Sequence, residues 1–322
     1  MKNQLLLTTA ILITCTGAFA QVTDAEKNLR AIEVDTVNGW KKGGLITFNI
    51  SQASFSDWAG GGQNSINFSG TFNAFANYIH NKSRWDNMLN VGYGMLRQGT
   101  QNGFIKTDDK LEFNTKYGRA AGHGWYYAAL ANFKSQMAAG YNYPNDSVII
   151  SKFMAPGYLI LALGMDYKPN EHFSAFISPI TSKNTFVQDQ RLADAGAFGV
   201  QAATYDTSGV LIKHGLQRRT EFGGYVRIMF RQTFFEDKSV TLLTKLDLFS
   251  NYAHNPQNID VNWETLISLK VNKLITASLG VTIVYDDDIK LPVDRNGDGV
   301  KESTGPRTQL KEILAIGIAY KF

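Results

Sequence analysis

The chain has 322 residues and a formal net charge of +4; 19% of its residues are charged and 12% are aromatic. This length fits two ordinary domains or one large β architecture. The small net charge, without a basic cluster interleaved with aromatic residues, argues against a nucleic-acid partner. The one cysteine, Cys15, lies in a segment that we expect to be removed, which excludes disulfides in the mature chain.

Residues 1–20 have the pattern of a secretory signal peptide. Lys2 supplies the positive start, Leu5–Ile13 form a short apolar core, and Ala-Phe-Ala at positions 18–20 is a cleavage site of the small-x-small type. We therefore expect cleavage after Ala20 and export of the mature chain. The alternative is a lipoprotein acylated on Cys15, but the threonine before this cysteine suits lipidation poorly.

Beyond the signal peptide, no apolar run approaches the roughly 18 residues of a spanning helix, so any membrane crossing requires strands. Residues 21–42 are polar without a sustained period, and we expect a periplasmic N-terminal lead-in there. Over residues 43–322, apolar and polar side chains alternate in a series of segments, which predicts β-strands. The twelve expected strands are Leu45–Phe55, Ser65–His80, Arg84–Gln98, Lys106–Tyr117, Trp125–Gln136, Tyr158–Lys168, Phe173–Thr181, Glu221–Phe235, Val240–Phe249, Val261–Val271, Ile275–Tyr285 and Leu310–Phe322.

The connections between these strands predict a closed barrel. Short connections follow even-numbered strands, and the long ones, Met137–Gly157, Ser182–Thr220 and Asp286–Gln309, follow odd-numbered strands. Outer-membrane barrels have an even number of strands, short periplasmic turns and long extracellular loops. We therefore expect an all-β fold, a transmembrane antiparallel β-barrel of about 12 strands over residues 43–322. A soluble exported sandwich is the alternative.

The last expected strand ends the chain on an aromatic residue. One of its faces carries Leu314, Ile316, Ile318, Tyr320 and Phe322. This alternation resembles the C-terminal strand of bacterial outer-membrane barrels, which serves as their assembly signal. The resemblance implies an outer-membrane location, with membrane lipid and the barrel-assembly machinery as partners.

Charged residues lie on the polar faces of the expected strands, which would face the lumen of a barrel. They can pair with one another structurally, or they can line a narrow selective pore. Twelve strands lie between the ~8 whose side chains fill a barrel and the ~16 that leave an aqueous channel, so size alone does not decide. The expected lumen residues are Asp86, Glu112, Lys116, Arg227, Arg231, Lys245, Asp247, Glu264, Lys270 and Lys311.

Several stretches carry a family resemblance. They are Trp40–Leu45, Asn49–Asn64, Trp85–Asn87, Tyr285–Asp288 and Gln309–Phe322. Together they resemble the Bacteroidota family catalogued as domain of unknown function 3078. The resemblance implies an exported outer-membrane protein, and it brings no activity, substrate or catalytic residue with it.

The most specific element of this resemblance joins the first two strands. It consists of Asn-x-x-Gln followed by Trp-Ala-x-Gly-Gly, carried by Asn49, Gln52, Trp58, Gly61 and Gly62. Consecutive glycines permit positive φ angles, and a tryptophan suits a membrane interface. We expect a structural turn here, with a ligand-contacting loop as the alternative.

The last long loop has the spacing of the first half of a calcium loop. Its candidate ligands are Asp294, Asn296, Asp298, Val300 and Glu302. Oxygen donors at alternate positions and a glycine at the sixth position suit Ca²⁺. The twelfth position is Gly305 rather than glutamate, so Glu302 would have to substitute for it, and Asp286–Asp288 could approach from the strand end. A solvated acidic turn is the alternative.

Hydrolytic motifs are incomplete. His172 and Ser174 have the His-x-Ser spacing of the outer-membrane phospholipase, without the rest of its motif. One loop carries Asp189, Asp194, Asp206 and His214 without a tight catalytic pattern, and no Gly-x-Ser-x-Gly element occurs. We therefore expect a passive small-solute pore or transporter rather than an enzyme. A non-conducting protein that presents surface loops is the alternative, and a barrel hydrolase comes third.

Overall fold

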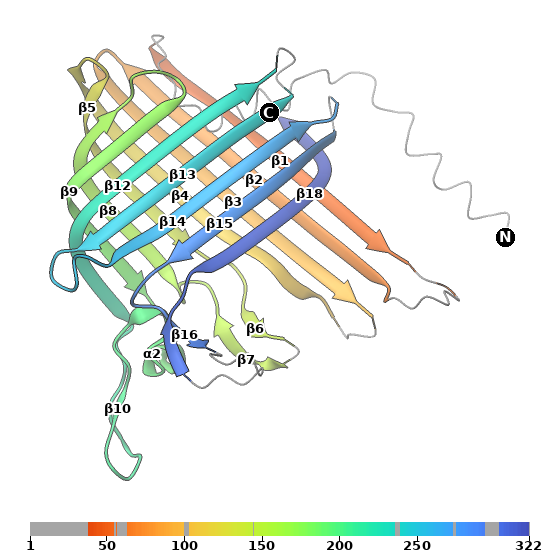
Figure 1. The fold of residues 1–322 in the computed structure, drawn as a ribbon, viewed down its shortest axis with the longest axis vertical. Helices are drawn as coiled ribbons and strands as arrows, with labels where there is room; N and C mark the ends of the chain where they lie inside the picture. The colour runs from red at the N-terminus through yellow and green to blue at the C-terminus, as the bar shows by residue number, and fades with distance from the viewer. Residues whose placement is uncertain are drawn as a thin grey trace.

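The computed structural model describes residues 38–54, 56, 63–99, 103–143, 145–235, 239–272, 275–293 and 303–321. In this part of the chain, twelve long strands form one closed antiparallel barrel (Figure 1). Around the barrel they are β1 (Gly39–Ala53), β18 (Gln309–Lys321), β15 (Ile275–Tyr285), β14 (Ile259–Lys270), β13 (Val240–Asn251), β12 (Arg218–Phe234), β9 (Phe173–Phe186), β8 (Gly157–Tyr167), β5 (Trp125–Ser135), β4 (Ile105–Gly122), β3 (Ser83–Gln98) and β2 (Ser65–His80). The same part of the chain holds no helix long and apolar enough to cross a membrane.

All twelve expected strands are present, and two of them, β2 and β15, have the expected bounds. The expected start of the barrel at residue 43 is wrong, because β1 begins at Gly39. Its first residues pair with the end of β2, from Gly39 opposite Ile79 to Gly44 opposite Ala74. The expected end of β9 at Thr181 is also wrong. Residues 182–186, of which the first four are polar, continue the ladder with both β8 and β12.

The connections separate the barrel into two ends, as expected. We call the end with the short β2–β3, β4–β5 and β8–β9 connections the turn end, and the opposite end the loop end. Among the residues that the structure describes, the loop end carries three two-stranded sheets and two short helices that periodicity did not predict (Figure 1). They are β6 (Gly140–Asn142) with β7 (Asn145–Ser151), β10 (Thr204–Tyr205) with β11 (Leu211–Lys213), β16 (Lys290–Val293) with β17 (Ser303–Pro306), the α-helix α2 (Gln190–Asp194) and the 3-10 helix η1 (Ala197–Gly199).

The outer wall exposes large apolar side chains on strands all around the barrel. They include Phe48, Phe113, Leu163, Ile177, Ile180, Phe222, Trp263, Leu314, Ile316 and Ile318. Near the turn end, the Trp40 ring lies 5.1 Å from Tyr78 and 5.9 Å from Trp85 between centroids. An apolar band with interfacial aromatic residues is the surface that barrels present to lipid. The sheet closes into a barrel and its outer surface is apolar, so the chain is not the two-sheet sandwich that was the alternative expectation.

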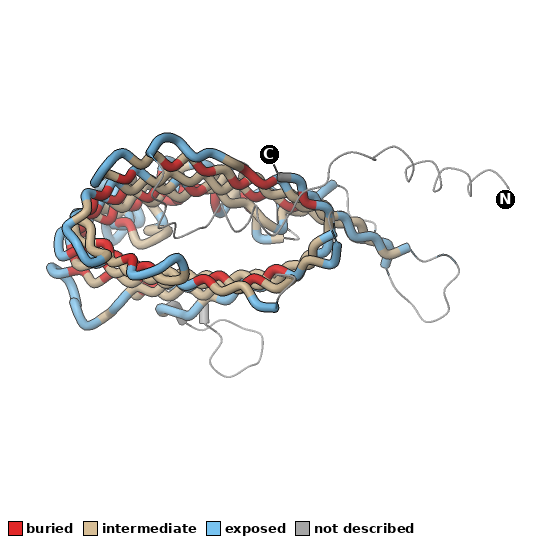
Figure 2. The backbone as a smooth tube through the Cα atoms, turned by 90° about the horizontal axis from the view of Figure 1, so that it is seen from above, coloured by how far each residue is buried: buried red, intermediate tan, exposed pale blue. Residues whose placement is uncertain are grey.

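The interior is divided unevenly. Figure 2 shows the barrel from above as a flattened ring. Inside one part of it, Leu130, Phe176, Tyr225 and Phe249 belong to a buried cluster that fills the space between β5, β8, β9, β12 and β13. Strands β1, β2 and β18 carry a smaller buried cluster of Leu45, Phe75 and Ala319.

The seam between β1 and β18 closes the barrel. It has five residue pairs, from Leu45 opposite Lys321 to Asn49 opposite Gly317, whereas β1 and β2 share fifteen. A Cβ atom at Gly317 would clash with Asn49 Oδ1 and with the Phe48 carbonyl oxygen, so this short seam requires a glycine. Leu314, Ile316, Ile318 and Tyr320 of β18 are exposed on the outer face, and Phe322 lies outside the described residues. Their role as an assembly signal stays a prediction.

Replacement of Gly317 by alanine should weaken barrel closure, because the new methyl group meets the Phe48 carbonyl oxygen, a backbone atom that cannot rotate away. We expect a loss of about 1–3 kcal/mol in the free energy of unfolding, as for an overpacked core. Urea titration in detergent, with heat-modifiable gel migration, measures it. The control is Gly280→Ala on β15, where the nearest atom is 3.9 Å away. Equal midpoints for both variants would contradict the role given to the seam.

Introduction of a charge at Ile180, midway along β9, should reveal the lipid-facing belt. Ile180 is 66% exposed, and Ile212 on the β11 hairpin is 67% exposed, so solvent accessibility alone does not distinguish them. An arginine near the bilayer midplane costs about 2–4 kcal/mol. We expect Ile180→Arg to lower the unfolding free energy in lipid vesicles, and Ile212→Arg to leave it unchanged. The same loss in both variants would argue against a bilayer around β9.

Candidate functional site

The lumen is the candidate functional site, because strand alternation directs the charged side chains of facing strands into it. Lys110 and Glu112 project from β4, and Glu264 projects from β14. These two strands are six positions apart in either direction around the barrel, so they form opposite walls. Interactions between them therefore cross the lumen.

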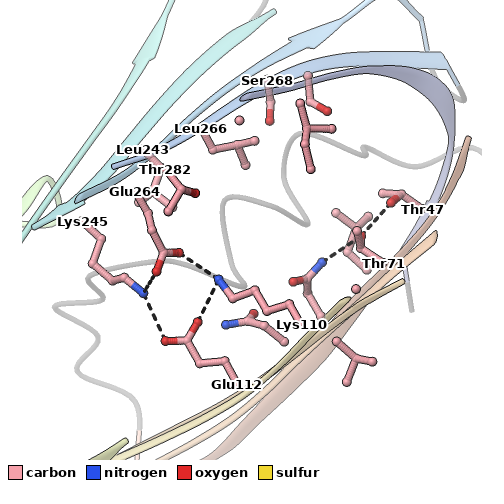
Figure 3. A pocket seen from close by; sticks show the side chains of 18 of the residues that line it. Thr47, Thr71, Lys110, Glu112, Leu243, Lys245, Glu264, Leu266, Ser268 and Thr282 are labelled. Atoms are coloured by element: carbon pink, nitrogen blue, oxygen red, sulfur yellow. Dashed lines mark hydrogen bonds and ion pairs between the residues drawn. The ribbon is translucent and has the colours of Figure 1, made fainter. Parts of the chain in front are cut away.

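Five residues form a network that we call the central bridge: Lys110, Glu112, Lys134, Lys245 and Glu264. Figure 3 shows Lys110, Glu112, Lys245 and Glu264. Across the lumen, Lys110 Nζ lies 2.8 Å from Glu264 Oε2, and Lys245 Nζ lies 3.1 Å from Glu112 Oε1. Lys110 also lies 3.0 Å from Glu112, and Lys245 lies 3.0 Å from Glu264. The central bridge thus joins β4 and β5 to β13 and β14 with alternating charges.

A buried arginine extends the central bridge. Arg227 on β12 donates from Nε to Asp247 Oδ1 at 2.6 Å and from Nη2 to Asp247 Oδ2 at 3.1 Å. Its Nη1 donates to Asn114 on β4 at 2.9 Å, and the Tyr225 hydroxyl donates to the same Asp247 carboxylate at 2.8 Å. Both Arg227 and Asp247 are 6% exposed, so this pair is part of the filled interior and is not an open charged ring.

A second cluster lies toward the turn end. Lys168 Nζ is 2.9 Å from Asp86 Oδ2, and Arg84 Nε is 3.1 Å from Asp86 Oδ1. Lys116 Nζ is 2.7 Å from Asp166 Oδ2, which joins β4 to β8. The carboxylates of this cluster, Asp86 and Asp166, are therefore each paired with a neighbouring cation.

A third cluster lies at the loop end. Lys183 Nζ is 2.6 Å from Asp260 Oδ2 and 2.8 Å from Asp286 Oδ2. Arg219 pairs with Asp288, and its Nη2 lies 3.2 Å from Glu221 Oε1. These contacts tie β9, β12 and β14 to the segment that follows β15.

This third cluster bears on the expected calcium site. Asp286 and Asp288, which could approach a calcium ion, instead pair with Lys183 and Arg219. Asp287 accepts a hydrogen bond from Asn258 Nδ2 at 2.8 Å. No cluster of three or more His, Cys, Asp or Glu side chains in the described part of the chain could hold a metal. The ligands proposed within residues 294–302 lie outside the described residues, so calcium binding stays a prediction.

Seven of the expected lumen residues lie in the clusters described above: Asp86, Glu112, Lys116, Arg227, Lys245, Asp247 and Glu264. Lys311 pairs with Asp108 toward the loop end, and Arg231 is buried toward the turn end. Lys270 is half-buried at the end of β14 and does not line the cavity. Sequence reasoning missed Lys110, although it shares the parity of Glu112, and it missed Lys134 and Asp166 on strands with weak alternation. It also missed Lys183, which lies beyond the expected end of β9 at Thr181.

The part of the lumen beside the central bridge encloses a cavity of ≈ 650 Å³. Its wall on β1 and β2 carries small uncharged polar side chains, which we call the polar wall: Thr47, Asn49, Asn67, Ser69, Thr71 and Asn73. Thr47 and Thr71 hydroxyl oxygens are 2.6 Å apart, and Asn49 Nδ2 donates to Ser69 Oγ at 3.2 Å. Figure 3 shows Thr47 and Thr71 on the wall that faces the central bridge across this space.

The cavity extends along most of the barrel. On β2 its lining runs from Asn67, two residues after the strand begins, to Asn77, three residues before it ends. On β4 it runs from Thr107 to Lys116. The lining therefore reaches toward both the loop end and the turn end.

The loop motif and the hydrolytic candidates are placed as follows. Asn49 lies on the polar wall and Gln52 is exposed on β1, while Trp58, Gly61 and Gly62 lie outside the described residues. Ser174 Oγ donates to Asp166 at 3.0 Å, so its partner is Asp166 rather than His172.

In the connection between β9 and β12, Asp194 accepts hydrogen bonds from Gln190, from His214 Nδ1 at 3.0 Å and from the Gly215 backbone N–H at 2.8 Å. The hydrogen bond from the Gln190 amide is the main cause that lowers the pKa of Asp194. The carboxylate therefore ties α2 to the segment before β12.

Replacement of Glu112 by glutamine should destabilise the folded barrel, because three lysines would then share Glu264 alone. Loss of one member of a buried ion-pair network typically costs about 3–5 kcal/mol. We expect a reduction of about 3 kcal/mol in the free energy of unfolding, measured by urea titration in vesicles. The control is Glu171→Gln, which removes an exposed carboxylate at the β8–β9 turn. An unchanged midpoint for Glu112→Gln would contradict a central bridge that stabilises the fold.

Comparison with known families and structures gives the following matches. Residues 50–141 match the model of a family described as "Protein of unknown function (DUF3078)". No curated protein matches the chain.

Among solved structures, the translocator domain of the autotransporter NalP from Neisseria meningitidis is 8% identical, with a TM-score of 0.35 over 94% of this chain and 93% of that chain. The COG4313 outer membrane channel from Pseudomonas putida F1 is 10% identical, with a TM-score of 0.38 over 90% and 100%. The beta domain of the Bordetella autotransporter BrkA is 10% identical, with a TM-score of 0.32 over 88% and 98%. Closure of the barrel in this chain rests on its own strand pairing. The segment 50–141 is thus similar in sequence to a family whose described function is unknown.

Proposed function

We propose that this protein is an outer-membrane barrel that lets small polar solutes pass through the part of its lumen beside the central bridge. The observation that carries the proposal is the cavity lined on one strand, β2, from Asn67 near the loop end to Asn77 near the turn end. A dead-end pocket would involve only one end of that strand. The apolar outer belt and the signal-peptide pattern support the outer-membrane location.

Side chains that cross or fill the lumen make the passage narrow. The central bridge crosses the flattened lumen, and the buried cluster around Phe176 and Tyr225 fills the space beyond it. The cavity of ≈ 650 Å³ falls in the size range of pockets that enclose one small ligand. We therefore expect small unit conductance and a low size limit, in contrast to the wide water-filled channels of barrels with about 16 strands.

A specific observation also favours the second candidate, a non-conducting protein that presents loops to a partner. The β10–β11 hairpin projects from the loop end in Figure 1. It exposes Tyr205, Val210 and Ile212, which are 55%, 62% and 67% exposed. Such apolar residues at the tip of a projecting loop fit an interaction surface. We further propose that calcium binds the last long loop and that the assembly machinery recognises β18. Both proposals are compatible with either candidate function.

Planar-bilayer recording of the purified mature chain tests the pore. We expect discrete small conductance steps, and we expect Asn73→Trp to reduce them, because Asn73 faces the cavity midway along β2. The matched control is Phe72→Trp at the adjacent position, which points toward the opposite face of the strand. The barrel must first be shown to be folded by circular dichroism. Silence from folded wild-type protein would overturn the pore and leave the loop-presenting role.

A further inference from the structure

The seam between β1 and β18 stops before either strand ends. Its last residue pair toward the loop end is Asn49 with Gly317, and beyond it β1 continues through residues 50–53 and β18 through residues 309–316. In the described part of the chain, these two stretches pair with β2 and with β15, and not with each other. Figure 1 shows β1 and β18 running in different directions toward the loop end. We call the gap between them the lateral opening.

The cavity beside the central bridge continues into the lateral opening. Where the seam is paired, Thr47 and Asn49 line the cavity from the inner face of β1, and the outward-facing Phe48 between them does not. Beyond the last pair, the lining includes residues of the outer face, which are 54%, 71% and 63% exposed: Ile50 of β1, and Leu314 and Ile316 of β18. A cavity lined by both faces of the wall reaches the outer surface of the barrel.

The lateral opening lies at the level of the lipid-facing belt. From the turn side to the loop side, the outer face of β18 carries Tyr320, Ile318, Ile316, Leu314 and Glu312. The aromatic and the charged residue suit the two membrane interfaces, with the apolar residues between them. At this depth, a strand edge without a partner strand is tolerated only where it is buried in protein or lines a water-filled cavity. The polar lumen behind the gap supplies that environment.

The two sides of the lateral opening differ in polarity. On the inner side, Asn49 and the exposed Ser51 line the cavity, and the polar wall continues behind them. Amide and hydroxyl groups donate and accept hydrogen bonds. On the outer side, Ile50, Leu314 and Ile316 present apolar surface, which favours contact with an alkyl chain. The opening therefore suits a molecule with a polar end and an apolar end.

Charge at the lateral opening favours one kind of polar end. Lys311 pairs with Asp108 of β4. Glu312 is exposed and also lines the cavity, so these three groups carry one net negative charge. Like charges repel, and they do so most strongly where lipid keeps water away. A carboxylate is therefore disfavoured relative to an uncharged polar group.

We propose that the lateral opening is a route between the lumen and the loop-side leaflet for single-chain amphiphiles with an uncharged polar head. The head contacts the polar wall, while the alkyl chain passes between Ile50 and Leu314 into lipid. This route goes beyond the passage of small polar solutes along the lumen. It rests on the proposed pore, because both use the same cavity.

Paired cysteines test whether the seam is open. Cys15 is the only cysteine in the sequence and lies in the expected signal peptide, so introduced thiols can be followed alone. Thr47→Cys with Ala319→Cys places two thiols at an observed residue pair. Ser51→Cys with Ala315→Cys places them on the same face, where continued pairing would make them opposite. Under mild oxidation in phosphatidylcholine vesicles, we expect a disulfide in the first variant and free thiols in the second. Equal rates of disulfide formation would overturn the lateral opening.

Two lipid-soluble probes test the route and its preference. Each carries a maleimide head on a hexadecyl chain, and one of them has an added carboxylate on the head. The target Thr71→Cys faces the cavity, and the matched control Phe48→Cys lies on the outer wall. We expect the uncharged probe to label both, with a higher ratio of uncharged to anionic labelling at Thr71→Cys. Addition of Glu312→Gln should lower this ratio to the value of the control. Equal ratios at the two positions before that addition would refute the preference for an uncharged head.

A water-soluble methanethiosulfonate reagent separates this route from the pore. If that reagent labels Thr71→Cys and the hexadecyl probes do not, the lateral route is wrong and the pore stands. If neither labels folded protein, both proposals fail. Ala315→Trp, which fills the opening, should abolish hexadecyl labelling and leave labelling by the water-soluble reagent unchanged. Equal loss of both would indicate an obstructed lumen and contradict the route. Disulfide-linked dimers of Ala315→Cys would place a second copy against β18 and also contradict it. Folding of each variant is checked by heat-modifiable migration.

Discussion

The interior of this barrel depends on the need to neutralise Glu112. Its side chain is fully buried, and a buried carboxylate without counter-charges would be strongly unfavourable. Lys110 on its own strand and Lys245 on the facing side supply those charges, and Glu264 balances the lysines in turn. These contacts hold the two broad walls of the flattened barrel together (Figure 2).

The central bridge also explains the unequal division of the interior. On one side, Arg227 and Asp247 form a buried bidentate pair beside Tyr225 and Phe176, so large side chains fill the space. On the other side, β1 and β2 contribute hydroxyl and amide side chains, which are too short to reach the bridge. A cavity with an uncharged polar lining remains. The proposed pore follows from this contrast between a filled part of the interior and a part that keeps a cavity along β2.

Alternation predicted the twelve strands well, because the outward and inward faces of a barrel meet such different environments. Leu314, Ile316 and Ile318 are exposed on the outer face of β18, where period two had placed them together. Prediction was weaker where polar residues occupy consecutive positions, as in residues 182–185 near the end of β9. In that segment neighbouring strands, rather than a local pattern, decide how far the ladder continues. The small sheets of the loops were missed because they are too short to show a period.

The sequence by itself determined the strand series, the even count, the lipid-facing residues and the two kinds of connection. These features depend on the two-residue repeat and on turn length, both of which are local. Only the tertiary structure decided which charges meet. Lys110 and Glu264 are separated by 154 positions in the chain and by six strands around the barrel. Their contact depends on the flattening and register of the closed sheet. Likewise, the lateral opening is recognisable only in the folded chain, because alternation within β1 and β18 does not show how far the two strands stay paired.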